Sequence, residues 1–210
     1  LTGANFENTN LSFVQFGGAN LSGVNFSGAD LSDTTLWYVD FSDINLSGAD
    51  LTNAKLEHAN FSGVDFSDVN LSGADLRDAD LTGANFNNVD LTGATIGNLS
   101  GADLREAKLY RATIGNLSGA DLTNVDLSYA DLTNSDLTGA DLTGADLTGA
   151  DLRYTKLAGA KFSGANMDDA DFLGADFTNA DLTGAFLRGV DLTNVNYDCN
   201  NLIPNALLMG

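Results

Sequence analysis

The sequence predicts an all-β solenoid, a fold in which short extended segments and corners wind around a continuous apolar core. The first observation is a five-residue spacing of large apolar residues, which starts at Leu1 and keeps one phase up to Ile96. The second is the composition of each unit. A small residue stands two positions before the large one, and Ser or Thr followed by Gly, Asn or Asp comes after it. The third is the single proline in 210 residues, which leaves the backbone N–H groups free to form ladders.

A five-residue period fits neither regular secondary structure. In a helix, five residues rotate the apolar position by about 140°, so no continuous apolar stripe forms. In a straight strand, an odd spacing places successive large residues on opposite faces. A three-residue extended segment does fit, because its small and large residues point inward while the Asp or Asn between them points outward. The Ser/Thr and Gly/Asn pair that follows is typical of a turn, so each unit is one extended segment and one corner.

The repeated unit also resembles a known family. Residues 140–157 begin with ADLTGADLTGADL, and in-phase units of this kind cover residues 1–202. This pattern is similar to that of the pentapeptide-repeat family, and the composition is most like its cyanobacterial and plastid branch. The resemblance implies a right-handed quadrilateral β-helix with four units per coil. Counting 42 units gives about ten coils and a rod roughly 50 Å long at ~4.8 Å per coil, with residues 203–210 as an apolar carboxyl-terminal tail or cap.

The period is interrupted twice by the same eleven residues. ATIGNLSGADL occurs at 94–104 and again at 112–122, and the spacing shortens at both places before it resumes. In one interpretation a corner is two residues short, so that the coil has 18 residues and Leu99 and Leu117 enter the core. In the other, each interruption is a three-residue bulge that leaves both leucines outside. We favour the short corner, because it buries both side chains and explains the 18-residue separation by stacking.

The inventory of reactive side chains argues against an enzyme. His58 is the only histidine and Cys199 the only cysteine, and they lie 141 residues apart, so no nucleophile–base pair is expected between them. A filled solenoid also offers no concave site where catalytic groups converge. Motifs for phosphate, zinc or calcium binding are absent. We therefore predict a non-enzymatic protein with no cofactor and no metal.

The charge restricts the partners. The chain has 29 Asp and Glu residues against 9 Lys and Arg, a net charge of −20. Such a surface repels nucleic-acid phosphates and anionic membranes, so we expect neither as a direct partner and expect a protein instead. No apolar run approaches the ~20 residues of a membrane span. The sequence leaves the compartment open between cytoplasm, periplasm and thylakoid lumen.

One group of unusual side chains stands out on the predicted surface. Its members form two columns with a 20-residue spacing, which places them on neighbouring coils at one corner: Trp37, Tyr38, Glu57, His58, Arg77 and Asp78. Glu57 and Arg77 are expected to pair across coils, and Asp78 is expected to reach His58. The group is either a set of contacts that only stabilises the coils or a docking site, because exposed Trp and Tyr with Arg resemble an interface hot spot.

Acidic residues form a second column in the carboxyl-terminal half. Asp131, Asp151, Asp171 and Asp191 have the same 20-residue spacing and are expected to lie one above another. Like charges directly opposite one another destabilise a sheet. Either the hydrogen bonds of the repeat outweigh this repulsion, or the charge serves a purpose.

These observations give one main hypothesis for the function and one alternative. The main hypothesis is a structural or protein-interaction rod. The alternative, implied by the resemblance to the quinolone-resistance branch, is an acidic DNA mimic that binds the topoisomerase DNA gyrase, although the sequence predicts no long projecting loop. An ice-binding face is disfavoured because the hydroxyl column at Ser22, Ser42, Ser62 and Thr82 mixes Ser with Thr. The open amino-terminal coil and the apolar tail predict an end-to-end homo-oligomer.

Overall fold

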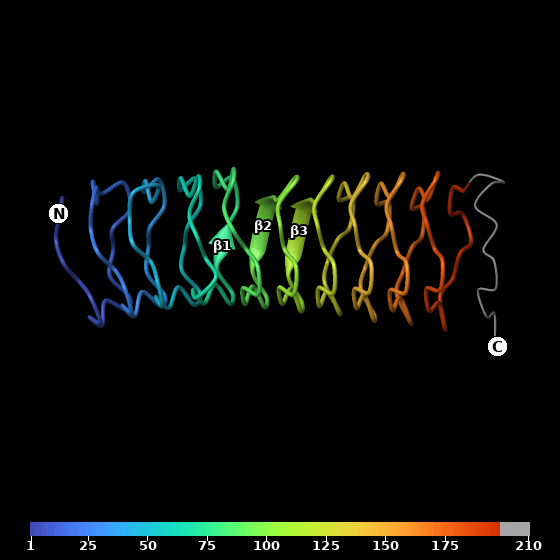
Figure 1. The fold of residues 1–210 in the computed structure, drawn as a ribbon, viewed down its shortest axis with the longest axis horizontal. Helices are drawn as coiled ribbons and strands as arrows, with labels where there is room; N and C mark the ends of the chain where they lie inside the picture. The colour runs from blue at the N-terminus through green and yellow to red at the C-terminus, as the bar shows by residue number, and fades with distance from the viewer. Residues whose placement is uncertain (198–210) are drawn as a thin grey trace.

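The structure, a computed structural model that describes residues 1–197, is a rod of stacked coils (Figure 1). Outward residues pair with their counterparts one coil further along, as in the parallel bridges Asn5↔Asn25 and Asp176↔Asn196. A coil of 20 residues holds four of the five-residue units, so the β-helix has four sides. The predicted all-β quadrilateral fold is therefore confirmed. A membrane-spanning helix is not found among residues 1–197. Cys199 and the tail at 203–210 lie outside the described residues.

Three short strands form the most regular part of the rod. They are β1 (Asp75–Leu76), β2 (Thr95–Asn98) and β3 (Thr113–Asn116), and they pair in parallel in the order β1-β2-β3. β1 pairs with β2 at Asp75↔Thr95, and β2 pairs with β3 at Thr95↔Thr113. Elsewhere the coils are joined through isolated bridges, because each extended segment is only about three residues long.

Most corners are four-residue turns with one residue in the left-handed region. In the unit 142–145, the N–H of Ala145 donates a hydrogen bond to the carbonyl of Leu142 at 3.0 Å. The third residue of this turn, Gly144, has a φ of 69°, as a type II turn requires. At most other corners this position holds Gly, Asn or Asp, which enter the left-handed region more easily than other residues. The corner composition in the sequence thus has a direct conformational cause.

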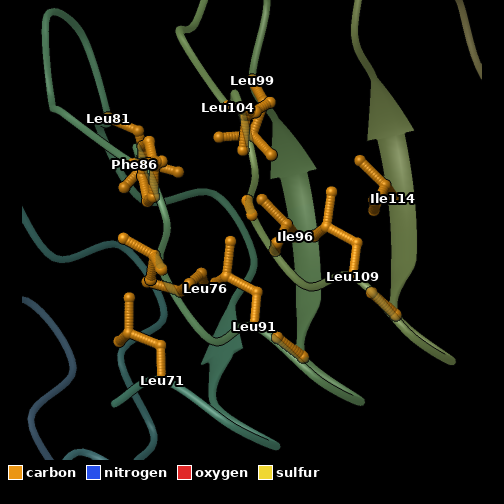
Figure 2. Packing of buried hydrophobic residues seen from close by; sticks show 14 of the residues in the cluster. Leu71, Leu76, Leu81, Phe86, Leu91, Ile96, Leu99, Leu104, Leu109 and Ile114 are labelled. Atoms are coloured by element: carbon orange, nitrogen blue, oxygen red, sulfur yellow. The ribbon is translucent and has the colours of Figure 1, made fainter. Parts of the chain in front are cut away.

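The core is a continuous stack of apolar side chains along the rod axis. The large residue of a unit and the small residue two positions earlier both point inward, and Ala140 and Leu142 are fully buried. Equivalent side chains of successive coils form rows, which Figure 2 shows for Leu71, Leu91 and Leu109. This arrangement confirms the predicted inward positions.

Both interruptions of the repeat are short corners. Leu99 is only 2% exposed and Leu117 is fully buried, and Figure 2 shows Leu99 among the core side chains. β2 and β3 extend through Gly97 and Gly115 and stack with the register Asn98↔Asn116, an 18-residue coil. The bulge interpretation is therefore wrong. The stacking is close, since a Cβ at Gly115 would lie 2.7 Å from the carbonyl oxygen of Gly97.

Candidate functional site

The fold brings the predicted group of unusual side chains together at one corner of three successive coils. The N–H of Tyr38 donates to the carbonyl of Glu57 at 3.1 Å, and the N–H of His58 donates to the carbonyl of Arg77 at 3.1 Å. These bonds hold the three corners in register. We call the group the corner patch: Trp37, Tyr38, Glu57, His58, Arg77 and Asp78.

The centre of the corner patch is a stacked pair of rings. The Tyr38 and His58 rings lie 4.6 Å apart between centroids, with an angle of 11° between their planes. Both residues occupy the left-handed position of their turns, each with a φ of 59°. Bulky residues are uncommon in this conformation, which costs about 1–3 kcal/mol for a residue other than Gly. A stacked aromatic pair is worth about 0.5–1.5 kcal/mol, so the stack offsets only part of that cost.

Trp37 lies over a glycine of the preceding coil. A Cβ at Gly17 would clash with Nε1 of the Trp37 indole, so the ring occupies the space that a side chain would fill. Gly17 has no positive φ and is therefore not needed for the turn itself. Trp37 is nevertheless 44% exposed, and Tyr38 beside it is 66% exposed. The patch thus presents two large aromatic surfaces to the solvent.

Charged groups form the other end of the corner patch. Arg77 Nε donates to Asp75 Oδ1 at 2.8 Å, and Arg77 Nη2 lies 2.5 Å from Asp75 Oδ2. The predicted pair with Glu57 also forms, with 3.5 Å between Arg77 Nη2 and Glu57 Oε1. The hydrogen bonds from Arg77 lower the pKa of Asp75, and those bonds and the Asp75 charge raise the pKa of Arg77. Glu57 Oε2 is shielded from solvent and accepts no hydrogen bond from the described residues.

One predicted contact of the patch does not form. Within residues 1–197 neither a hydrogen bond nor an ion pair joins Asp78 to His58. The ring of His58 stacks on Tyr38 in the preceding coil instead. The backbone explains this choice, because residues 38, 58 and 78 share the left-handed turn conformation and their side chains leave the corner in parallel. Parallel side chains favour stacking of the flat rings of Tyr38 and His58 over a hydrogen bond between the edge of the His58 ring and the Asp78 carboxylate.

The acidic column also forms as predicted. The backbone bridges Asp131↔Asp151, Asp151↔Asp171 and Asp171↔Asp191 place the four aspartates on successive coils. Each carboxylate accepts a hydrogen bond from a backbone N–H two residues further on, such as Thr133 N to Asp131 Oδ1 at 3.0 Å. These bonds hold the carboxylates in fixed positions along the column.

A cation interrupts the repulsion in this acidic column. Arg153 Nε donates to Asp151 Oδ1 at 2.8 Å, and the same Nε lies 3.7 Å from Asp171 Oδ2. The hydrogen bonds from Arg153 lower the pKa of Asp151. Hydrogen bonds from Thr193, first from its backbone N–H and then from its side chain, lower the pKa of Asp191. No group of three or more His, Cys, Asp or Glu side chains in residues 1–197 is arranged to hold a metal ion.

The comparisons with known proteins now decide the family. The family model described as pentapeptide repeats matches the chain with eight copies, at residues 1–37, 29–68, 59–96, 116–153 and 155–194. The chain belongs to the pentapeptide-repeat family. Its fold is the right-handed quadrilateral β-helix of that family. The family model does not match residues 97–115. These residues span the first short corner and reach the second.

Solved structures of the same family are similar to this chain over most of its length. One is HetL, a pentapeptide repeat protein involved in heterocyst differentiation regulation from the cyanobacterium Nostoc sp. strain PCC 7120. It is 30% identical, with 93% of this chain and 90% of HetL covered and a TM-score of 0.31. Another is QnrB1, a plasmid-mediated fluoroquinolone resistance protein, with 26% identity, coverage of 95% and 92%, and a TM-score of 0.42. A thylakoid-lumen protein of Arabidopsis thaliana is 24% identical, with coverage of 66% and 68% and a TM-score of 0.17. No curated protein matches the sequence significantly.

Two residues of the site were missed in the sequence. Asp75 is the main partner of Arg77, and Gly17 makes room for Trp37. The sequence does hold a signal for the Asp75–Arg77 pair. An Asp stands two positions before an Arg in three ADLR segments, and in each segment the two side chains bind one another. The second is visible only once coils are stacked, since Gly17 stands 20 residues before Trp37.

Proposed function

We propose that the protein is a non-enzymatic interaction rod and that the corner patch docks a protein partner. The observation that carries this proposal is the Tyr38–His58 stack beside the exposed Trp37. Bulky rings stand there at turn positions where Gly or Asn is easier to accommodate. A role in coil stability alone explains this poorly, because the stack returns less free energy than the left-handed conformations cost.

The chemistry of the patch indicates the kind of surface that it fits. Trp and Tyr supply a large rigid contact area, and Arg77 supplies guanidinium donors at the edge. The surrounding rod is strongly acidic, with a net charge of −20 for the chain. The partner surface should therefore have an apolar cleft for the rings and a basic rim, which complements the charge and speeds association.

Substitutions at the turn positions test this proposal without touching the core. The variant Trp37→Thr/Tyr38→Asn restores residues that ordinary corners of this rod carry. Tyr154→Asn is the matched control, because Tyr154 has the same left-handed turn position and lies over Gly174 in the carboxyl-terminal half. The measurement is quantitative affinity capture from an extract of the organism that makes the protein.

We expect the parent and Tyr154→Asn to capture the same amount of one partner. The double variant should capture at least tenfold less of it. Loss of a hot spot typically costs 2 kcal/mol or more, which corresponds to about thirtyfold in affinity. Capture of the same proteins in the same amounts by all three proteins would refute the proposal.

A second candidate function is that of an acidic DNA mimic that binds a topoisomerase. The observation that favours it is the linear charge density of the rod. A net charge of −20 along about ten coils of ~4.8 Å gives roughly one charge per 2.4 Å, against about 1.7 Å for duplex DNA. Inhibition of DNA supercoiling by purified gyrase tests it. We expect inhibition that weakens when Asp131, Asp151, Asp171 and Asp191 become Asn, and no inhibition at any concentration would exclude it.

We also propose that two copies can associate end to end. In the amino-terminal coil, Leu1 is 61% exposed, and Phe6 and Leu11 are only partly buried. Burying these side chains against a second copy would remove apolar surface from water while bringing few charges together. Light scattering at high concentration and high salt tests this, with and without residues 203–210. A strict monomer under all these conditions would refute it.

A further inference from the structure

A crevice opens in the side of the rod where a 20-residue coil meets the first 18-residue coil. It has a volume of about 830 Å³, inside the range of about 300–1,000 Å³ that is usual for ligand sites. One lip contains residues 79–88, the other contains residues 98–105, and Ser67 and Asp68 lie at one end. The crevice is separate from the acidic column and from the aromatic end of the corner patch.

Backbone groups on both lips lack partners. The N–H groups of Leu81 and Gly83 donate no hydrogen bond within residues 1–197, and the carbonyls of Asn98 and Ser100 accept none. In closed coils the equivalent groups pair directly. For example, the N–H of Gly119 donates to the carbonyl of Thr138 at 2.9 Å. Unpaired backbone groups near a core carry a free-energy cost unless water or a ligand satisfies them.

The change of coil length does not by itself force this opening. The opposite change, from an 18-residue to a 20-residue coil, occurs between Asn116 and Asp136, and there the bridge Asn116↔Asp136 forms. The N–H of Leu117 donates to the carbonyl of Asp136 at 2.7 Å. Within the described residues, one change of coil length is thus closed and the other is open. The equivalent bonds are also missing between Leu46 and Asp65, where the spacing between coils is 20 residues, so the opening does not depend on coil length.

The arrangement of the free groups matches an extended peptide. Among the free groups of the lips, the N–H groups of Leu81 and Gly83 belong to residues two apart, and so do the carbonyls of Asn98 and Ser100. A strand presents its backbone groups to the same side at every second residue and to the opposite side at the residues between. The carbonyls of one extended segment can therefore accept hydrogen bonds from the N–H groups of the first lip, and its N–H groups can donate to the carbonyls of the second.

The side chains of the crevice select the charge of that segment. Asp68, Asp80 and Asp103 contribute three carboxylates, and the one cation among the lining residues, Arg105, is bound to Asp103 through Nε–Oδ1 at 2.8 Å. The net charge of the lining is therefore negative. Lysine or arginine side chains on the inserted segment would pair with Asp68 and Asp80.

We propose that this crevice binds an extended, basic peptide segment of another protein by backbone pairing with both lips. The probe is a blocked hexapeptide of alternating Lys and Thr, added to the full chain. The readout is amide hydrogen exchange at Leu81 and Gly83, which should be fast in the free protein. The N–H of Leu117 serves as the reference, because it is already hydrogen-bonded.

Saturating peptide should slow exchange at Leu81 and Gly83 at least tenfold and leave Leu117 unchanged. The same peptide N-methylated at every residue cannot donate to the carbonyls of Asn98 and Ser100 and should give no protection. Asp68→Asn/Asp80→Asn should weaken binding of the unmodified peptide several-fold, whereas Asp141→Asn, remote from the crevice lining, should not.

Two results would overturn the proposal. Absence of protection at millimolar peptide would mean that water alone fills the crevice, and equal protection by the N-methylated peptide would mean that the backbone does not pair. The Trp37→Thr/Tyr38→Asn variant separates this site from the corner patch, because it should lose the docked partner and still bind the hexapeptide. The two proposals therefore fail independently.

Discussion

Substituting alanine at the two short corners gives a sharp test of how these coils stack. Gly97 and Gly115 occupy the same position in two identical eleven-residue segments, and neither has a positive φ. A Cβ at Gly115 would lie 2.7 Å from the carbonyl oxygen of Gly97, whereas a Cβ at Gly97 would lie 3.4 Å from the nearest atom, the backbone nitrogen of Asp78. The same substitution thus meets a clash at one site and an ordinary contact at the other.

The magnitudes follow from these distances. Gly115→Ala must push two backbones apart by several tenths of an ångström within a paired ladder, and overpacking of this kind costs about 1–3 kcal/mol. Gly97→Ala keeps its contacts and reduces the freedom of the unfolded chain, so it should be neutral or stabilise by up to about 1 kcal/mol. The assay is chemical denaturation of both variants beside the parent. Equal free energies of unfolding for the two variants would refute the close stacking of β2 and β3.

Four further predictions concern the core, the surface charge and the patch. Leu142→Asp should unfold or break the rod, because it puts a charge in a dry stack, and circular dichroism identical to the parent would contradict this. Leu99→Ala and Leu117→Ala should each cost about 2–5 kcal/mol in thermal or chemical melts, where an exposed site would cost under about 0.5 kcal/mol. Stability should fall below about pH 4. Hydrogen bonds to the i+2 residue lower the pKa of many aspartates below 3.8, so their contribution is present above that value and is lost as pH falls through the folded pKa values. A rise in melting temperature on acidification would show that charge repulsion dominates instead. Gly17→Ala should displace the Trp37 indole and shift its fluorescence to the red with little loss of stability.

The sequence predicts this fold well because each unit carries both its inward residues and its corner. The five-residue spacing selects the core, and Gly or Asn at the turn fixes the left-handed position, as at Gly144. The short corners were also predictable, since burying Leu99 and Leu117 accounts for both the repeated segment and its 18-residue separation.

The candidate sites were predicted only in part. The 20-residue spacing identifies which side chains are neighbours, and it correctly pairs Glu57 with Arg77. It does not give side-chain direction, so the stack of Tyr38 on His58 was missed in favour of a contact with Asp78. The open ladder at Leu81 has no signal in the spacing either, because a hydrogen bond depends on small displacements between coils that residue identity alone does not reveal.

The left-handed position of each corner has a consequence for how such a rod can change. This residue points away from the core, and its backbone is set by the turn, so Gly, Asn, Tyr, His, Arg and Phe all occupy it at different corners of the same chain. Because contacts extend only to neighbouring coils, a change at one corner is felt locally and not along the whole rod. A new recognition surface can therefore evolve by substitution at one corner at a time. Each bulky residue costs about 1–3 kcal/mol of folding stability, while the apolar core stays unchanged.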